Sequence, residues 1–273
     1  MGVRHWRGAA RGIVVVRRLG SGGLAAIMVL FLVLPVLSLV VSVTPAAIGQ
    51  AITDTAFRSA LWLSVRTTLL SQLIAVGTGT ALAWRVLALR PRWRRLIIIV
   101  VHLPVVIPPA VIGVAFLWAL GRNGLLGQPL FAIGVSIPFT PLAVVLAQVA
   151  VSAPLYVLGA TAAFGGVNPD LITVARTLGA SRAGAFFRVV LPIALPGMSS
   201  AATLAWARAL GEFGATLLFA GNLSGRTQTL PLLILTAMEA DVQLAVAVAL
   251  ILAAIAALSL VAVRLIPSLY VPA

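Results

Sequence analysis

Residues 168–192 read NPDLITVARTLGASRAGAFFRVVLP, a capped and charged stretch in a chain that is otherwise almost entirely apolar. Asn168 is a good helix N-cap, Pro169 suits the first helical position, and Asp170 complements the helix dipole. The next apolar residues recur at i, i+3, i+4 and i+7 and so share one helical face: Leu171, Val174, Ala175 and Leu178. The stretch therefore opens with a short amphipathic helix.

The second half of the stretch predicts the end of that helix and the start of another. Gly179 permits the left-handed turn that stops a helix. Ser181 can cap a second short helix, and Leu191-Pro192 then leads into the next apolar segment. We expect a surface helix that is tied tightly to a membrane helix, and the periodicity alone fits either a helix that rests on the lipid interface or one that binds a partner.

The flanking sequence places this stretch in a membrane protein. Of 273 residues, 62% are hydrophobic and 9% are charged, whereas a soluble domain carries about 25% charged residues. A bilayer crossing takes about 20 apolar residues in a helix. Six segments qualify, at about 24–43, 67–84, 96–120, 142–164, 196–220 and 242–263. We expect an all-α polytopic membrane protein with about six transmembrane helices in a single domain, 1–273.

The basic residues predict the orientation of these spans. Most of the 19 arginines lie in the N-terminal tail, in alternate loops and at the end of the sixth span. By the positive-inside rule, both termini and the loop 165–192 face the cytoplasm, with residues 1–23 as a cytoplasmic tail. The net charge of +14 is thereby explained by topology, and nucleic acid is not expected as a partner.

The composition also excludes several kinds of chemistry. The chain has no cysteine, so disulfides, thiolate metal sites and cysteine nucleophiles are excluded. It has no lysine, and a phosphate-binding P-loop needs one. Its five acidic residues and two histidines are too scattered for a metal site or a pair of catalytic carboxylates. We expect a non-catalytic subunit without metal or cofactor.

One ionisable pair falls inside the fifth apolar segment. Arg208 and Glu212 stand at i and i+4, where they can pair on one face of a helix. Intramembrane charges are costly and usually face a cavity or each other. Two interpretations stay open: an ion pair that fixes helix packing, or a pair beside a translocation pathway where Arg208 offers donors to an oxyanion. With Phe213 and Gly214 the pair forms the candidate pathway and gate.

The spacing of the opening stretch resembles the EAA loop of ABC-importer permeases. Val174-Ala175, three residues, Gly179, nine residues, Val189, one residue and Leu191-Pro192 fall in register with it. The resemblance implies a coupling loop at 165–192 that docks on a separate cytoplasmic ATPase. The implied coupling residues are Asp170, Thr173, Val174, Ala175, Gly179, Leu191 and Pro192. Thr173 departs from the family, which usually has glutamate at this position.

Two further stretches resemble the permease subunit of molybdate ABC importers. These are GEFGAT (211–216) with GRTQTLP (225–231), and LPVVIPPAVIG (103–113) with LGRNGLLG (120–127). The resemblance implies a type I ABC-importer fold and molybdate transport across a bacterial or archaeal cytoplasmic membrane, with tungstate or sulfate as alternatives. It also implies ATPase subunits, a second copy of the chain and an extracytoplasmic oxyanion-binding protein as partners.

A different class of protein, an ion-coupled secondary transporter, would use Arg208 and Glu212 for proton coupling. It predicts inverted repeats and ionisable residues on several spans. No such repeats are visible, and only one span carries a buried acid. Pro104, Pro108 and Pro109 interrupt the third span, either as a static kink or as a hinge beside the gate.

Overall fold

The computed structural model describes the backbone of residues 5–264 and the side chains of residues 22–262. The arginine side chains of the expected tail 1–23, and that of Arg264, lie outside the described residues. Every regular element in the described part is helical. The expected all-α fold is confirmed.

Five helical rods are long and apolar enough to cross a membrane. They are α1 (His5–Ser42), α3 (Thr55–Leu87), α7 (Pro141–Gly165), the rod of α9 (Arg182–Ala185), a π-helical turn (Phe186–Val190) and α10 (Leu191–Leu210), and α13 (Val242–Arg264). The pair α4 (Pro91–Val106) and α5 (Pro109–Leu120) meets the same length and hydropathy criteria only when taken together, with a bend of 108° between the two helices. The described chain thus has five of the six predicted spans as single rods, and six spans when α4 and α5 are counted as one broken crossing.

The break in the third span lies at Ile107-Pro108, and Pro104 sits inside α4. Pro109 is at the first turn of α5, where its missing N–H costs no helical hydrogen bond. The residue before a proline is biased towards an extended conformation, and Ile107 adopts ψ 131°. Two consecutive prolines thus end one helix and start another in a new direction.

The bounds predicted for the fifth span, 196–220, are wrong. The helix runs without interruption from Arg182 to Leu210 and stops at Gly211. A π-helical turn precedes Pro192, and the Leu191 N–H donates to the Phe186 carbonyl there. Because the wider turn accommodates a residue that cannot donate, the helix passes through Leu191-Pro192 and does not begin there.

The centre of the bundle is built from α3, α7 and α10. Tyr156, Phe164, Val190 and Met198 are among its buried side chains. Small residues bring α7 and α10 close together, since a Cβ on Gly197 would lie 2.7 Å from the Ala163 Cβ. This tight contact gives the loop at 165–192 a rigid base.

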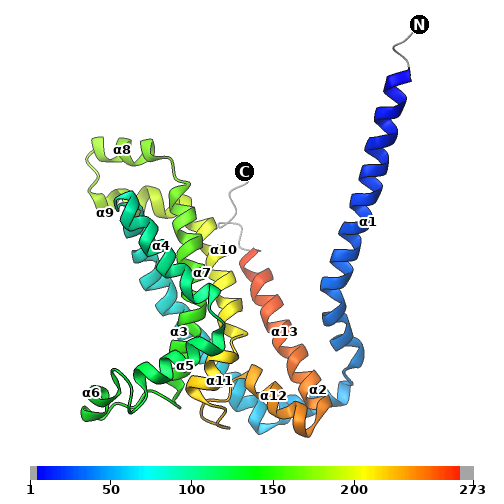
Figure 1. Cartoon of the computed structure of the whole chain (residues 1–273), viewed down its shortest axis with the longest axis vertical. Helices are drawn as coiled ribbons and strands as arrows, with labels where there is room; N and C mark the ends of the chain where they lie inside the picture. The colour runs from blue at the N-terminus through cyan, green and yellow to red at the C-terminus, as the bar shows by residue number, and fades with distance from the viewer. Residues whose placement is uncertain (1–4, 265–273) are drawn as a thin grey trace.

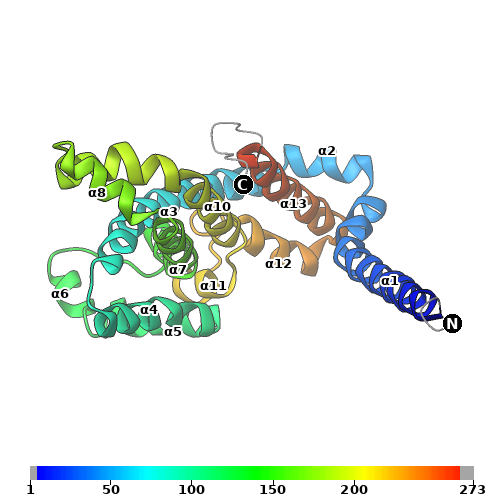
Figure 2. The same ribbon diagram turned by 90° about the horizontal axis from the view of Figure 1, so that it is seen from above.

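Figure 1 shows two distinct ends of the molecule. The start of α1, the start of α4, α8 (Pro169–Thr177) and the end of α13 lie at one end. The opposite end carries three short helices that were not predicted, α2 (Pro45–Thr53), α6 (Gly127–Ala132) and α12 (Leu230–Ala240). Figure 2 shows α1 standing apart from the bundle, on the side away from α6. The basic loops thus share one end of the described chain.

Candidate functional site

The exposed helix α8 has the caps that its sequence predicts. Asn168 Oδ1 accepts a hydrogen bond from the Asp170 N–H at 2.9 Å. Beyond the helix, Gly179 adopts φ +90°, and the Ala180 N–H donates to the Ala175 carbonyl at 3.0 Å. This left-handed stop turns the chain sharply into α9, which Ser181 caps by accepting from the Gly184 N–H at 3.0 Å.

The apolar face of α8 points away from the rest of the described chain. Leu171 and Val174 are exposed, and Leu178 is 83% exposed. The inward face is carried by Ile172, which packs against the central core. An apolar stripe that its own protein does not cover is typical of an interaction surface.

An aromatic cluster attaches this loop to the bundle. The ring of Phe186, just after α9, lies 4.9 Å from that of Trp84 at the end of α3 and 5.7 Å from that of Phe164 in α7. Trp84 and Phe164 contact each other edge to face at 5.7 Å. Rings from α3, α7 and the π-helical turn thus pack together at the base of the loop.

The candidate coupling residues divide into two groups. Asp170, Thr173 and Val174 are exposed on α8, Ala175 is half-buried, and Gly179 forms the stop. Thr173 bonds within its own helix, where its hydroxyl donates to the Pro169 carbonyl at 3.2 Å. Leu191 and Pro192 lie apart from these in the long rod, where Leu191 packs against the core.

Arg208 and Glu212 form the only ion pair in the described part of the chain, with 2.6 Å between the guanidinium and one carboxylate oxygen. The other carboxylate oxygen accepts from the Ala215 N–H at 2.7 Å. Glu212 is 1% exposed and Arg208 is 33% exposed. The carboxylate therefore joins the end of α10 to the start of α11 (Gly214–Ala220), and the partly exposed guanidinium pairs with it through one of its nitrogens.

The second half of the broken third span, α5, adjoins α11 at this point. A Cβ on Gly214 would lie 3.2 Å from the Ala110 N at the start of α5. A Cβ on Gly113 would lie 2.7 Å from the Ala215 carbonyl. Close approach of α5 and α11 thus depends on these two glycines. The prolines mark the break in the third span, but the stop at Gly211 was not predicted, and nothing in the sequence signals that α5 and α11 meet.

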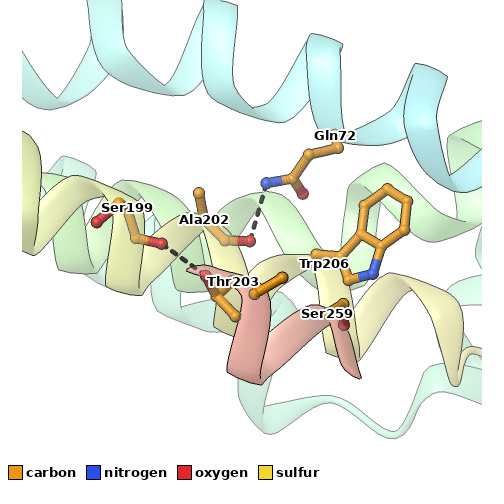
Figure 3. A pocket seen from close by; sticks show the side chains of 7 residues that line it. Gln72, Ser199, Ala202, Thr203, Trp206 and Ser259 are labelled. Carbon is orange, nitrogen blue, oxygen red and sulfur yellow. Dashed lines mark hydrogen bonds between the residues drawn. The ribbon is translucent and has the colours of Figure 1, made fainter. Parts of the chain in front are cut away.

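A cavity of about 400 Å³ opens between α3, α10 and α13, lined by Gln72, Ser199, Ala202, Thr203, Trp206, Ser259 and Ala262 (Figure 3). The Gln72 amide N–H donates to the Ala202 carbonyl at 2.9 Å. Gln72 Oε1 and Trp206 Nε1 are buried without a hydrogen-bond partner in the described chain. Sequence reasoning missed this cavity, although a lone amide in an apolar span is a signal.

At the opposite end of the molecule, the segment GRTQTLP forms a compact loop before α12. The Leu223 carbonyl accepts three backbone N–H groups, from Arg226, Thr227 and Gln228. The Leu230 N–H donates to the Ser64 hydroxyl of α3 at 2.8 Å. This loop is therefore fixed to the bundle, with Arg226 exposed at its tip.

Residues 74–269 match the family model described as "Binding-protein-dependent transport system inner membrane component". Among curated proteins, the chain is 42% identical over 230 residues to the molybdenum transport system permease protein ModB of Mycobacterium tuberculosis, covering 84% of this chain and 87% of the relative. It is 37% identical over 243 residues to the probable transport system permease protein NifC of Clostridium pasteurianum, covering 89% and 85%.

Solved structures show the same fold at low sequence identity. A bacterial ABC transporter for import of the acidic polysaccharide alginate matches with a TM-score of 0.73 and 18% identity, over 96% of this chain and 97% of that one. The methionine ABC transporter MetNI in an inward-facing conformation matches with a TM-score of 0.59 and 18% identity, over 78% and 95%.

Proposed function

The chain belongs to the family of inner membrane components of binding-protein-dependent transport systems, and we propose that it is the permease subunit of an ATP-driven molybdate importer. One observation carries this proposal: a relative named for molybdenum transport shares 42% of its residues over 84% of the chain. The fold of ABC-importer permeases supports the same function. The chain is then a non-catalytic membrane subunit.

The energy for transport comes from a separate cytoplasmic ATPase. This chain has no lysine for a P-loop, while α8 presents an uncovered apolar stripe beside a fixed glycine turn. A helix docks in a groove of a partner by such a stripe. Asp170, Thr173, Val174, Ala175 and Gly179 then form the docking face, and Leu191-Pro192 form the joint that carries its motion into α10.

The oxyanion passes beside Arg208, Glu212, Phe213 and Gly214. Arg208 is partly exposed and retains donors that its single contact with Glu212 does not use. Weak and transient contact suits a pathway, because cargo that is held tightly is not released. Proton coupling by this pair is disfavoured, since both oxygens of Glu212 are already engaged, by Arg208 and by the Ala215 N–H.

The geometry of the subunit indicates its partners. One chain offers one docking helix, so a two-fold homodimer presents two helices to a pair of ATPase subunits. The rest of the described chain does not bury the apolar segment Gly22–Ser42 of α1, so this segment can contact lipid or a second copy. An extracytoplasmic oxyanion-binding protein delivers molybdate at the end that carries α6 and α12. Both termini then face the cytoplasm.

Substrate choice is tested by uptake into proteoliposomes that contain the permease, its ATPase and its binding protein. We expect ATP-dependent uptake of molybdate. An excess of unlabelled tungstate should suppress this uptake more strongly than the same concentration of sulfate does. Sulfate uptake without molybdate uptake would contradict molybdate as the cargo and would leave the family assignment intact.

A further inference from the structure

A groove between α8 and α9 lies beside the apolar stripe. Its volume is about 470 Å³, and it is lined by Ile172, Thr173, Arg176, Thr177, Gly179, Ala180 and Ser181. The positive φ of Gly179 produces the turn that holds the two helices apart. The groove is thus a shaped feature of the docking end, distinct from the stripe of Leu171, Val174 and Leu178.

The polar groups of this groove favour the binding of an anionic group. No acidic residue lines it, and Arg176 has no acidic partner within the described residues. The Ser181 oxygen accepts from the Gly184 N–H, which leaves the hydroxyl proton free to donate. The hydroxyls of Thr173 and Thr177 already donate hydrogen bonds to carbonyls of α8. A guanidinium and a free hydroxyl on one groove fit a carboxylate, which accepts hydrogen bonds only.

We propose that a carboxylate side chain of the cytoplasmic ATPase enters this groove and pairs with Arg176. The proposal rests on the proposed function and adds the chemistry of the partner. Thr173 is bonded within α8 and offers no negative charge. In this contact the ATPase supplies the negative charge, and Arg176 of the permease supplies the positive charge.

Position argues for a protein partner and against a lipid headgroup. The start of α4 carries the marks of a membrane interface, with the Arg92 guanidinium 5.7 Å from the Trp93 ring. Figure 1 shows α8 beyond the start of α4, at the end of the described chain where the start of α1 also lies. A groove displaced outward from the interface faces a cytoplasmic partner.

The chain's lack of lysine permits a direct test. In Arg176→Lys the new side chain carries the only lysine amine, and a water-soluble carbodiimide joins an amine to a carboxylate that touches it. Permease in phosphatidylcholine nanodiscs is mixed with the purified ATPase, with Arg182→Lys as the matched control. We expect a covalent permease–ATPase product for Arg176→Lys, mapped by mass spectrometry to one acidic residue, and little for Arg182→Lys, which lies outside the groove.

Affinity supplies the second measurement. Arg176→Glu should weaken binding of the ATPase about tenfold at low salt, and the loss should shrink as ionic strength rises. The Arg182→Glu permease should lose much less of its affinity for the ATPase. If Arg176→Lys binds the ATPase without forming the product, or if Arg176→Glu binds as tightly as Arg182→Glu, the inference is overturned. A requirement for anionic lipid at Arg176 would overturn it in favour of a headgroup. Failure of the unaltered permease to bind any ATPase would instead refute the proposed function.

Discussion

Glu212 links the end of the fifth span to the short helix α11 that follows it. One oxygen pairs with Arg208 and the other accepts the Ala215 N–H, so the carboxylate is both half of an ion pair and an acceptor for the first turn of α11. The sequence predicts the pairing, because i and i+4 share a helix face. It does not predict the hydrogen bond to the Ala215 N–H, because that bond depends on the end of α10 at Gly211.

At this site, stability and transport can be separated by two variants. Arg208→Ala leaves a carboxylate that is 1% exposed without its partner, and should cost about 3–5 kcal/mol of folding free energy. Adding Glu212→Gln removes the stranded charge and keeps an oxygen for the Ala215 N–H, so most of the stability should return. Thermal unfolding in detergent measures both.

Uptake should remain low in the Arg208→Ala, Glu212→Gln double variant, because the arginine donors are still missing. Normal uptake by this restabilised variant would mean that the pair serves packing alone and that the pathway lies elsewhere.

Among the elements, α8 and its glycine turn have the clearest expected role. Gly179 has open space around its Cα but a φ of +90°, so a β-branched side chain is strained there by its backbone and not by crowding. Gly179→Val should therefore redirect α8, and ATP hydrolysis should become uncoupled from uptake while the protein stays in the membrane. Gly179→Asn is the control, since asparagine tolerates the left-handed region.

The assay for this prediction is the ratio of molybdate taken up to ATP hydrolysed. A normal ratio in Gly179→Val would show that the orientation of α8 does not matter, contrary to its role in docking. A fall in both Gly179→Val and Gly179→Asn would point to a general loss of packing at the turn.

Hydropathy predicted the spans but not their ends or their arrangement. The prolines of α4 and α5 predict a break in the third span. The direction of α5 after the bend of 108° also involves its close packing against α11 through Gly113 and Gly214. The fifth span was misplaced because a π-helical turn absorbs Pro192, which local patterns do not encode. Caps and stops of α8 were predictable because they depend on neighbouring residues alone.

At the scale of the whole molecule, the alternation of basic loops agrees with the two ends seen in Figure 1. The chain has no cysteine, so single cysteines report topology without background. Leu178→Cys, directly after α8, should react with a membrane-impermeant maleimide only from the cytoplasmic side. Ser224→Cys, in the exposed loop before α12, should react only from outside. Labelling of both from one side would contradict the orientation.

The central claim is that this chain transports molybdate only when a separate ATPase drives it. The most direct measurement is molybdate accumulation in proteoliposomes with the binding protein outside and ATP inside, with and without the ATPase subunit. We predict accumulation against a gradient with the ATPase and none without it. Accumulation in its absence, driven by a proton gradient alone, would contradict the claim and favour an ion-coupled transporter.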